Sequence, residues 1–534
     1  MLKRLVVHPF LLAVYPILAL FAYNRSQVFV WTAYRSILIS LFFTTLFFLL
    51  FRLFLRDWHK AGLIVTPILI FVFSYGHIFT YIEDAKILGI NIGRHRVLII
   101  LVLISLVSVF IWLVRTKRQL IGVSQAINIL GFVALIFPLF QLATFEIRAS
   151  KAASSESGSS VELKALQTNL SMLSVPNGEI RPDIYYIILD TYTRDDTLKT
   201  YFQIDNSAFL SSLEDMGFYV ARCSQSNYAL TQPSLASSLN MDYLDALDNN
   251  KVNAPTFINS ILRNNATRRV LERLGYKIVV TESGFSPTEW SDADVYLTTN
   301  RGVGKAILTG GINPFEAILL KTSMGIFLYE YKPRLSYQIQ SFLDTAYTEH
   351  RSRILFALEE LSEVYKIQGP KFVFTHILIP HSPFIFGQNG EIIGRKHPFT
   401  LNDDQEIREP EKYQKGYRDQ LLYVNSRILP IIQAIISKSK VLPIIILQGD
   451  HGTKAQVSSR NARMTILNAY YFPGNEKNVL YPTITPVNTF REVFNLYFGG
   501  NLPLLKDVSY FSQYGDRNKS TIIMPNERPN CETP

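Results

Sequence analysis

Five apolar segments fill the first 145 residues, and they constrain the fold more than any other feature of the sequence. They cover roughly residues 5–23, 37–55, 62–81, 97–114 and 126–145. Each has about 18–20 residues, the length that a helix needs to cross ~30 Å of hydrocarbon. The composition agrees, because hydrophobic residues make up 48% of the chain and the mean hydropathy is +0.14. We therefore predict a transmembrane domain of five helices over residues 1–145.

The distribution of Lys and Arg around these segments predicts their orientation, because both residues favour the cytoplasmic side. One side carries eight of them: Lys3, Arg4, Arg52, Arg56, Lys60, Arg115, Lys117 and Arg118. The other side carries five: Arg25, Arg35, Lys86, Arg94 and Arg96. The N-terminus is thus expected in the cytoplasm, and everything after Phe145 outside it. The first segment lacks a small-residue cleavage site, so we expect a retained anchor in the inner or plasma membrane.

Charge and cysteine content narrow the classes of partner. The net charge of +10 is spread along the chain without a Lys/Arg-rich block, which gives nucleic-acid binding little support. An anionic lipid surface is the simpler partner. The two cysteines, Cys223 and Cys531, exclude a disulfide framework and a cysteine-rich zinc site. One disulfide between them remains open if both lie outside the cytoplasm.

The rest of the chain divides by composition. Residues 146–180 include a Ser/Gly/Ala-rich stretch typical of a flexible linker. Over residues 181–500, apolar strand-like runs alternate with helical patterns, which predicts an α/β domain with a mostly parallel sheet covered on both faces. Residues 501–534 form a C-terminal tail. The apolar stretch 313–331 fits either a helix on the outer leaflet or a buried core helix.

Two of the predicted strands end in possible metal ligands. Asp190 closes "DIYYIILD", and Asp450 and His451 follow "IIILQG" between two glycines. Ligands of parallel sheets bind beyond the carboxyl ends of the strands. If these two strands are neighbours, two carboxylates and an imidazole converge, a set that suits one divalent ion such as manganese, zinc or magnesium. The alternative for each residue is an ordinary turn or cap.

Four motifs in this order, "PDIYYIILD", "NYALTQPSLASSLN", "THILIPHSPF" and "GDHG", resemble those of the alkaline phosphatase/sulfatase superfamily over about residues 181–500. With five preceding spans, the layout is similar to that of membrane-anchored lipoteichoic acid synthases and phosphoethanolamine transferases. The resemblance implies a sulfatase-like fold and an extracytoplasmic catalytic domain. It also implies a metal site with at most four protein ligands: Asp190, Thr231, Asp450 and His451.

The same resemblance assigns the nucleophile and the groups around the substrate. Thr231 of "TQPSL" takes the nucleophile position at the start of a helix. A metal can lower the pKa of its hydroxyl, and the helix N-terminus favours a bound phosphate. His381 would hydrogen-bond the transferred group. Three further candidates for substrate binding are His376, Lys454 and Asn227, for which core packing or a solvated surface is the other reading.

The departures from the superfamily pattern restrict the reaction. Thr231 cannot become the formylglycine of sulfatases, and Leu235 stands where their pattern has Arg. Residue 191 is Thr, so the second adjacent Asp of many sulfatases is missing. We expect a phosphorus-containing head group to move from a phospholipid to an envelope glycan or glycolipid through a phospho-threonine. The alternatives are a membrane-anchored phosphodiesterase or sulfatase-like hydrolase that uses water, and a non-catalytic scaffold for envelope assembly.

Overall fold

The computed structural model describes residues 5–25, 28–83, 85–87, 90–91, 93–154, 161–175, 181–247, 255–299, 310–394, 398–401, 409–453, 460–474, 476–511, 522–523 and 526. The chain divides into two compact units. The helical unit comprises residues 1–147, 301–348 and 395–401, and the sheet unit comprises residues 148–300, 349–394 and 402–534.

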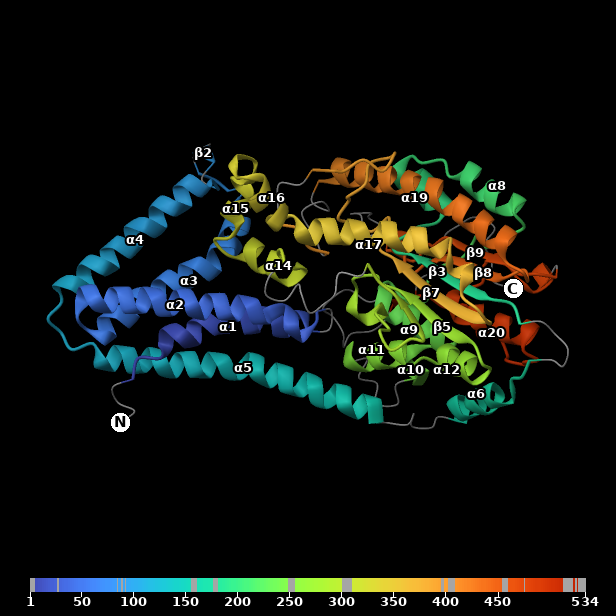
Figure 1. Cartoon of the computed structure of the whole chain (residues 1–534), viewed down its shortest axis with the longest axis horizontal. Coiled ribbons are helices and arrows are strands. Elements are labelled where there is room, and N and C mark those ends of the chain that lie inside the picture. Colours follow the sequence, from blue (N-terminus) through green and yellow to red (C-terminus); the bar gives the residue numbers. More distant parts are fainter. Residues whose placement is uncertain are drawn as a thin grey trace. The chain divides into compact units, whose positions relative to one another are not determined.

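The five apolar segments form five helices, as predicted (Figure 1). They are α1 (His8–Asn24), α2 (Tyr34–Leu55), α3 (Trp58–Ile82), α4 (His95–Arg115) and α5 (Ile121–Ser154). The short strands β1 (Lys86–Ile87) and β2 (Ile90–Asn91) pair between α3 and α4. Among the described residues, four stretches are long and apolar enough to cross a membrane: 30–55, 58–82, 95–115 and 121–147. Helix α1 is apolar but has 17 residues.

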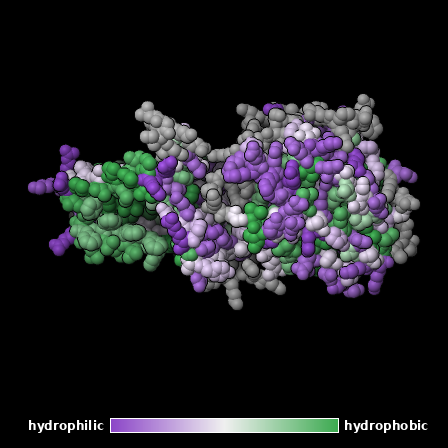
Figure 2. Space-filling view, turned by 90° about the horizontal axis from the view of Figure 1, so that it is seen from above, coloured by the Kyte–Doolittle hydropathy of each residue, from purple (hydrophilic) through white to green (hydrophobic). Residues whose placement is uncertain are grey.

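The surface of the helical unit matches this assignment. Figure 2 shows a broad apolar surface in green over these helices, with hydrophilic residues at its ends. Large side chains such as Phe42, Leu53 and Ile104 are more than half exposed. Exposed apolar side chains in such number are expected where lipid, rather than water, surrounds the helices.

A later segment of the chain also belongs to the helical unit. It contains α14 (Pro314–Thr322), α15 (Ile326–Glu330) and α16 (Tyr337–Leu343). The guanidinium of Arg35 in α2 binds both carboxylate oxygens of Glu316 and the carbonyl of Gly311, at 2.6 Å for the latter. The sequence-based boundary of 181–500 did not anticipate that this segment packs with the N-terminal helices. The stretch 313–331 is thus built into a protein core, where Phe315 is fully buried.

The sheet unit is built on a sheet of seven strands in the order β4-β9-β8-β3-β7-β5-β6. Their bounds are β4 Tyr219–Val220, β9 Asn468–Tyr471, β8 Ile444–Gly449, β3 Ile184–Leu189, β7 Lys371–Ile377, β5 Lys277–Thr281 and β6 Val295–Leu297. Strand β9 is antiparallel to its neighbours β8 and β4, and every other pair is parallel. The prediction of a mostly parallel sheet is therefore confirmed.

Helices cover both faces of this sheet (Figure 1). Ile184, Tyr186 and Ile188 of β3 share one hydrophobic core with the helices on one face. Those helices are α9 (Thr231–Asn240), α10 (Leu244–Leu247), α11 (Pro255–Arg263), α12 (Ala266–Arg273) and α20 (Pro486–Tyr497). The remaining helices of the unit are α7 (Asp195–Phe202), α8 (Ser207–Asp215), α17 (Thr345–Leu361) and α19 (Pro410–Lys438). Within the predicted linker, α6 (Val161–Met172) contributes Leu166 and Leu170 to the same core.

The described part of the C-terminal tail folds back on the sheet unit. Strand β10 (Tyr510–Phe511) pairs with β11 (Ile522–Ile523). The amide of Asn526 donates to the carbonyl of Cys223 at 2.6 Å and accepts from Arg194 at 3.3 Å. Cys223 is disulfide-bonded. The only other cysteine of the sequence, Cys531, lies outside the described residues.

Candidate metal centre

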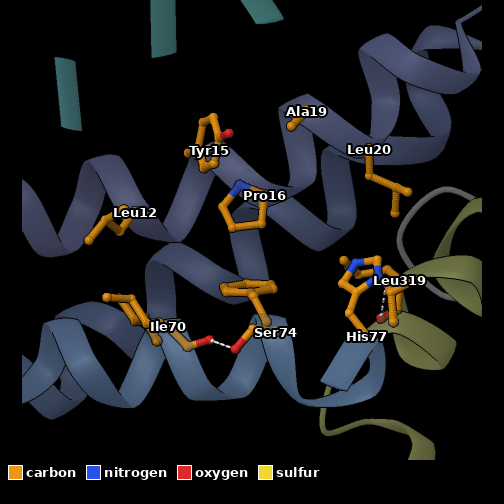
Figure 3. Close-up of a pocket in the computed structure, with 12 residues that line it drawn as sticks. Leu12, Tyr15, Pro16, Ala19, Leu20, Ile70, Ser74, His77 and Leu319 are labelled. Atoms are coloured by element: carbon orange, nitrogen blue, oxygen red, sulfur yellow. Dashed lines mark hydrogen bonds between the residues drawn. The ribbon is translucent and has the colours of Figure 1, made fainter. Parts of the chain in front are cut away.

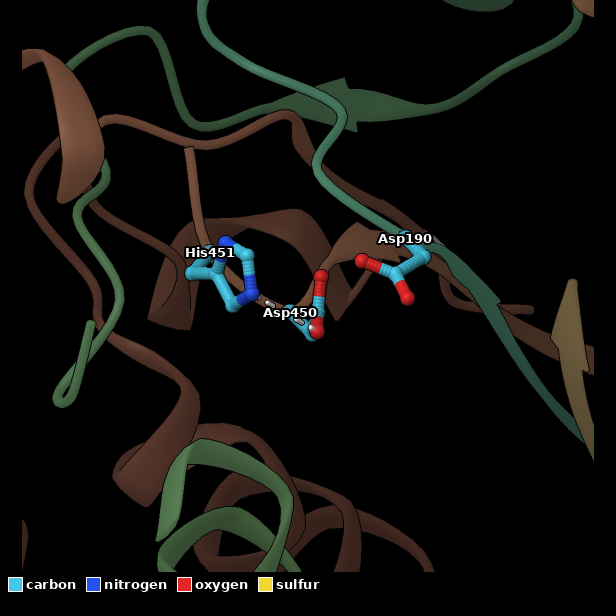
Figure 4. Close-up of side chains that lie close together, drawn as sticks. All are labelled: Asp190, Asp450 and His451. Carbon is cyan, nitrogen blue, oxygen red and sulfur yellow. Dashed lines mark ion pairs between the residues drawn. The ribbon is translucent and has the colours of Figure 1, made fainter. Parts of the chain in front are cut away.

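Asp190 and Asp450 leave the same edge of the sheet. Strands β3 and β8 are parallel neighbours with Leu189 opposite Gly449, so the residue after each strand emerges at the same level. One ligand atom from each of Asp190, Asp450 and His451 lies within 4.8 Å of the other two (Figure 4). All three residues are at most 3% exposed. The expectation that these strands are neighbours is confirmed.

The two glycines that flank Asp450 and His451 have steric causes. A Cβ atom at Gly449 would collide with the carbonyl oxygen of Tyr192, in the loop that follows Asp190. A Cβ atom at Gly452 would collide with the carbonyl oxygen of Ala462. The backbone can therefore bring the two acidic strand ends together only if both positions lack a side chain.

Thr191 fixes one oxygen of Asp450. Its φ is +63°, a left-handed conformation that is rare for a β-branched residue and stores strain. In this conformation its N–H donates to Asp450 Oδ1 at 2.9 Å, and its carbonyl accepts from the Tyr417 hydroxyl at 2.8 Å. Sequence reasoning noticed Thr191 only as a missing acid, and no sequence signal pointed to Tyr417 on α19.

The remaining ligand atoms fit a metal ion. Asp190 Oδ1 and Asp450 Oδ2 are buried and have no hydrogen-bond partner among the described residues. Such orphaned carboxylate oxygens are costly unless a cation binds them. His451 Nδ1 lies 2.8 Å from the carbonyl of Gly452. A carbonyl only accepts, so Nδ1 carries the proton and Nε2 keeps its lone pair, the tautomer that a metal ligand needs.

The pKa values of Asp190 and Asp450 are shifted in opposite directions. Burial, and next the charge of Asp450, raise the pKa of Asp190. Burial would also raise the pKa of Asp450, but His451, His376 and the Thr191 N–H outweigh it and lower that pKa. Two carboxylates in one buried site repel each other. A divalent cation would remove this repulsion, which is a second reason why these residues fit a metal.

Thr231 stands beside the cluster at the start of α9. Its Oγ1 lies 3.4 Å from His451 Nε2, and the residue is half-buried. Ser234 Oγ donates to the carbonyl of Asp450 at 2.6 Å, which ties the first turn of α9 to the end of β8. The hydroxyl of Ser237 donates to the carbonyl of Asp242 at 2.7 Å. The two serines thus hold the fold together, and Thr231 is the hydroxyl next to the ligands.

His376 approaches the cluster from β7. Its ring is fully buried, with Nδ1 3.1 Å from Thr288 Oγ1 and Nε2 3.5 Å from Asp190 Oδ2. We predicted a substrate-binding role, but the observed neighbour is a carboxylate of the cluster. This geometry makes His376 a support for Asp190, and Thr288 is a partner that sequence reasoning missed.

The other predicted substrate-binding residues have different outcomes. His381 lies half-buried in the loop after β7, and its backbone carbonyl accepts from Gln420 Nε2 at 3.1 Å. Lys454 lies outside the described residues. Asn227 is fully buried, and its amide binds Thr485, Val508 and the N–H of Val487 at 2.8–2.9 Å. This network uses the side chain of Asn227 to hold the fold, and its role in substrate binding stays a prediction.

Comparison with known proteins gives distant likenesses. No protein-family model and no curated protein matches the sequence. The chain is similar to the C-terminal periplasmic domain of EcEptC from Escherichia coli in complex with Zn (13% identity, TM-score 0.41, 66% of this chain and 95% of that chain covered). It is also similar to the integral membrane lipooligosaccharide phosphoethanolamine transferase A from Neisseria meningitidis (12% identity, TM-score 0.39, 92% of this chain and 95% of that chain covered). A third likeness is to the phosphonate monoester hydrolase of Agrobacterium radiobacter (13% identity, TM-score 0.35, 62% of this chain and 80% of that chain covered). Values this low carry no argument about function.

Proposed function

We propose that the protein is a membrane-bound, metal-dependent phosphotransferase. It would move a phosphorus-containing head group from a phospholipid to an envelope glycan or glycolipid. The observation that carries this proposal is the convergence of Asp190, Asp450 and His451 beside the Thr231 hydroxyl at a helix N-terminus. Orphaned carboxylate oxygens, a ligand-ready imidazole and a hydroxyl together are the groups that metal-assisted phosphoryl transfer requires.

The residues of the site have separate roles in this reaction. Asp190, Asp450 and His451 Nε2 would hold the ion, with Thr231 Oγ1 as a further ligand. A divalent ion there would lower the pKa of the threonine hydroxyl and neutralise charge on the phosphate. Thr231 Oγ1 attacks the donor phosphorus, and the bond from phosphorus to the diacylglycerol oxygen breaks. The acceptor hydroxyl then attacks the phospho-threonine and restores Thr231.

The first turn of α9 supports the phosphoryl group. Its backbone N–H groups point out of the helix start, where the helix dipole favours an anion. Pro233 occupies the third helical position and has no N–H, which leaves the amides of Thr231 and Gln232 to face the ligand. We assign to His381, in the loop after β7, a hydrogen bond to the transferred group.

The membrane helices determine on which side of the membrane the proposed reaction takes place and how close the site is to its lipid donor. The bias of Lys and Arg supports a cytoplasmic N-terminus and an extracytoplasmic sheet unit. An anchor of this kind keeps the site near a lipid donor and raises the donor's effective concentration.

The test is intact-mass spectrometry of the full chain in detergent with manganese or zinc and candidate phospholipids. We expect the wild type to gain one head-group mass and Thr231→Ala to gain none. Thr231→Ser should retain the adduct, and Ser237→Ala is the matched control for a hydroxyl lost from the same helix. An adduct on Thr231→Ala would reject the nucleophile. Released head-group phosphate without transfer would favour the hydrolase, and absence of both metal and adduct would favour the scaffold.

A further inference from the structure

A cavity of about 350 Å³ lies within the helical unit, between α1 and α3. Figure 3 shows Leu12, Pro16 and Leu20 of α1 facing α3, with His77 of α3 and Leu319 of α14 together at one end. Its walls are almost entirely aliphatic and aromatic. Helix α3 is long and apolar enough to cross a membrane, so this cavity opens among helices that hydrocarbon surrounds.

The sequence of α1 explains why the two helices leave space between them. Pro16 has no N–H for the carbonyl of Leu12, and its ring disturbs the helix one turn earlier. Ala19 follows on the same wall with a single methyl group. A proline and an alanine in succession on one face cannot fill the gap that leucine side chains would fill.

Water is a poor occupant of this cavity. A space of this size would take up several water molecules, and each buried water needs two to four polar partners. The lining hydroxyl of Ser74 donates to the carbonyl of Ile70 at 2.6 Å. The hydroxyl of Thr322 donates to the carbonyl of Ile318 at 3.0 Å. Both hydroxyls are thus used inside their own helices. Tyr15 and His77 are the other lining residues that carry polar groups, which are few for a space of this size.

The polar side chains are unevenly distributed. His77 lies with Leu319 at the α14 end (Figure 3), whereas Leu12 and Ile70 line the other part, and the polar residues Tyr15 and Ser74 lie between them. A molecule with a long apolar part and one polar end matches this arrangement. Helix α14 is held in place there by the buried pair of Arg35 and Glu316 and by the bond from the Asn313 amide to the carbonyl of Thr32, at 3.0 Å.

We infer that this cavity seats one acyl chain of a membrane phospholipid, with the chain between α1 and α3 and the ester end next to His77. The occupant follows from the surroundings, because α3 and α2 are long and apolar enough to cross a membrane and the walls of the cavity do not suit water. This lipid seat is independent of the metal centre and does not require the reaction proposed above.

The experiment is photo-crosslinking of the full chain in phosphatidylcholine nanodiscs. The probe is phosphatidylglycerol with a diazirine in the middle of one acyl chain. We expect labelled peptides to concentrate in residues 12–20 and 69–77. Helix α4 is the reference, because its Leu101 and Leu103 are 59% and 54% exposed and contact bulk lipid. Labelling of α1 and α3 no higher than that of α4 would overturn the inference.

Two substitutions sharpen the test from opposite walls. Ala19→Trp fills the cavity from α1, and Ile70→Trp fills it from α3, where Ile70 is 50% exposed and tolerates a larger side chain. Both should lose the excess labelling. The matched control is Ala143→Trp on the exposed face of α5, which should keep it. Excess labelling that survives both fillings would also overturn the inference.

A second readout separates this inference from the proposed function. Turnover of a short, water-soluble phosphodiester reports the metal centre without using the cavity. Ala19→Trp and Ile70→Trp should leave it unchanged. A wild type that shows no turnover but concentrates the label in α1 and α3 would remove the proposed reaction and retain the lipid seat.

Discussion

A hydrogen bond at Nδ1 orients each of the two buried histidines of the metal centre, His451 and His376, and determines which group its Nε2 faces. The carbonyl of Gly452 holds His451 Nδ1 at 2.8 Å and turns Nε2 toward the ligand cluster. The hydroxyl of Thr288 holds His376 Nδ1 at 3.1 Å and turns Nε2 toward Asp190. One ring is therefore placed to bind the ion, and the other is placed to orient a carboxylate that binds it.

Removing the support that His376 and Thr288 give to Asp190 should weaken metal binding. We expect His376→Ala and Thr288→Val to reduce the affinity for zinc about 10- to 100-fold, the usual effect of losing a group that orients a ligand. Thr288→Ser keeps the hydroxyl and should retain most of the affinity. Competition with a chromophoric chelator measures the Kd without any substrate. An unchanged Kd in His376→Ala would show that Asp190 needs no support.

Glu289 should give the stability of the sheet unit a pH dependence. Burial is the main cause that raises its pKa from 4.5 to about 7, and the N–H groups of Gly284 and Ser283 oppose the shift. Because the unfolded chain ionises first as pH rises, this carboxyl contributes stability below about pH 4.5 that is lost as pH rises through 7. The full effect is about 3 kcal/mol at 1.36 kcal/mol per unit.

Glu289→Gln should therefore flatten the change in Tm between pH 4.5 and 8, measured on the full chain in detergent. Glu359→Gln on the exposed surface of α17 removes a carboxylate without removing a buried one, and it is the control. A Tm profile of Glu289→Gln that is as steep as that of the wild type would assign the pH dependence to other groups.

At the scale of residues, the sequence predicted the site residues that directly follow strands. It did not predict those that are distant in the sequence and contact the site only in the folded chain. Asp190, Asp450 and His451 were identifiable because strand ends at one sheet edge must meet. Thr288 is not identifiable in this way, since nothing in "SPTEW" shows that its hydroxyl reaches a histidine 88 residues later. The hydrogen bonds of Asn227 inside the fold were likewise not predictable, because an asparagine that serves the fold and one that binds a substrate look alike in sequence.

At the scale of elements, the site depends on how closely the loop after β3 approaches the end of β8. Gly449→Ala would push the end of β8 away from the carbonyl of Tyr192 and displace Asp450. We expect a loss of metal affinity of at least about tenfold, because a ligand displaced by an ångström no longer fits the coordination distance. The matched substitution is Gly394→Ala, where a Cβ atom meets nothing within 4 Å. Equal zinc affinities for the two variants would contradict the steric argument.

Strands and spanning helices were predictable from pattern, but the position of α14 to α16 was not. Apolar runs bounded by turns identified β3, β7 and β8, because a strand buried on both faces must be apolar throughout. The stretch 313–331 shows an equally apolar pattern. An apolar helix face carries no sign of whether its partner is a sheet or a spanning helix, so its place in the helical unit required the structure.

At the scale of the whole molecule, one buried ion pair joins distant parts of the chain. Arg35 and Glu316 are 281 residues apart, and their side chains are 10% and 9% exposed. Arg35→Gln leaves Glu316 without its partner and should cost about 3–5 kcal/mol. Arg25→Gln breaks the more exposed pair with Glu146 and should cost about 0–1 kcal/mol. Thermal unfolding in detergent compares them, and similar Tm losses would show that the buried pair does not anchor the segment.

The disulfide of Cys223 has a consequence for the biosynthesis of this protein, because it must form after the chain is made. Asn526 contacts the carbonyl of Cys223, so a side chain 303 residues further along the sequence lies beside the disulfide-bonded residue. Disulfides form in oxidising compartments and are kept reduced in the cytosol. Under the proposed orientation, the sheet unit acquires this disulfide only after it has left the cytosol. Maturation is then completed after export, by an oxidant that the protein meets only on the far side of the membrane.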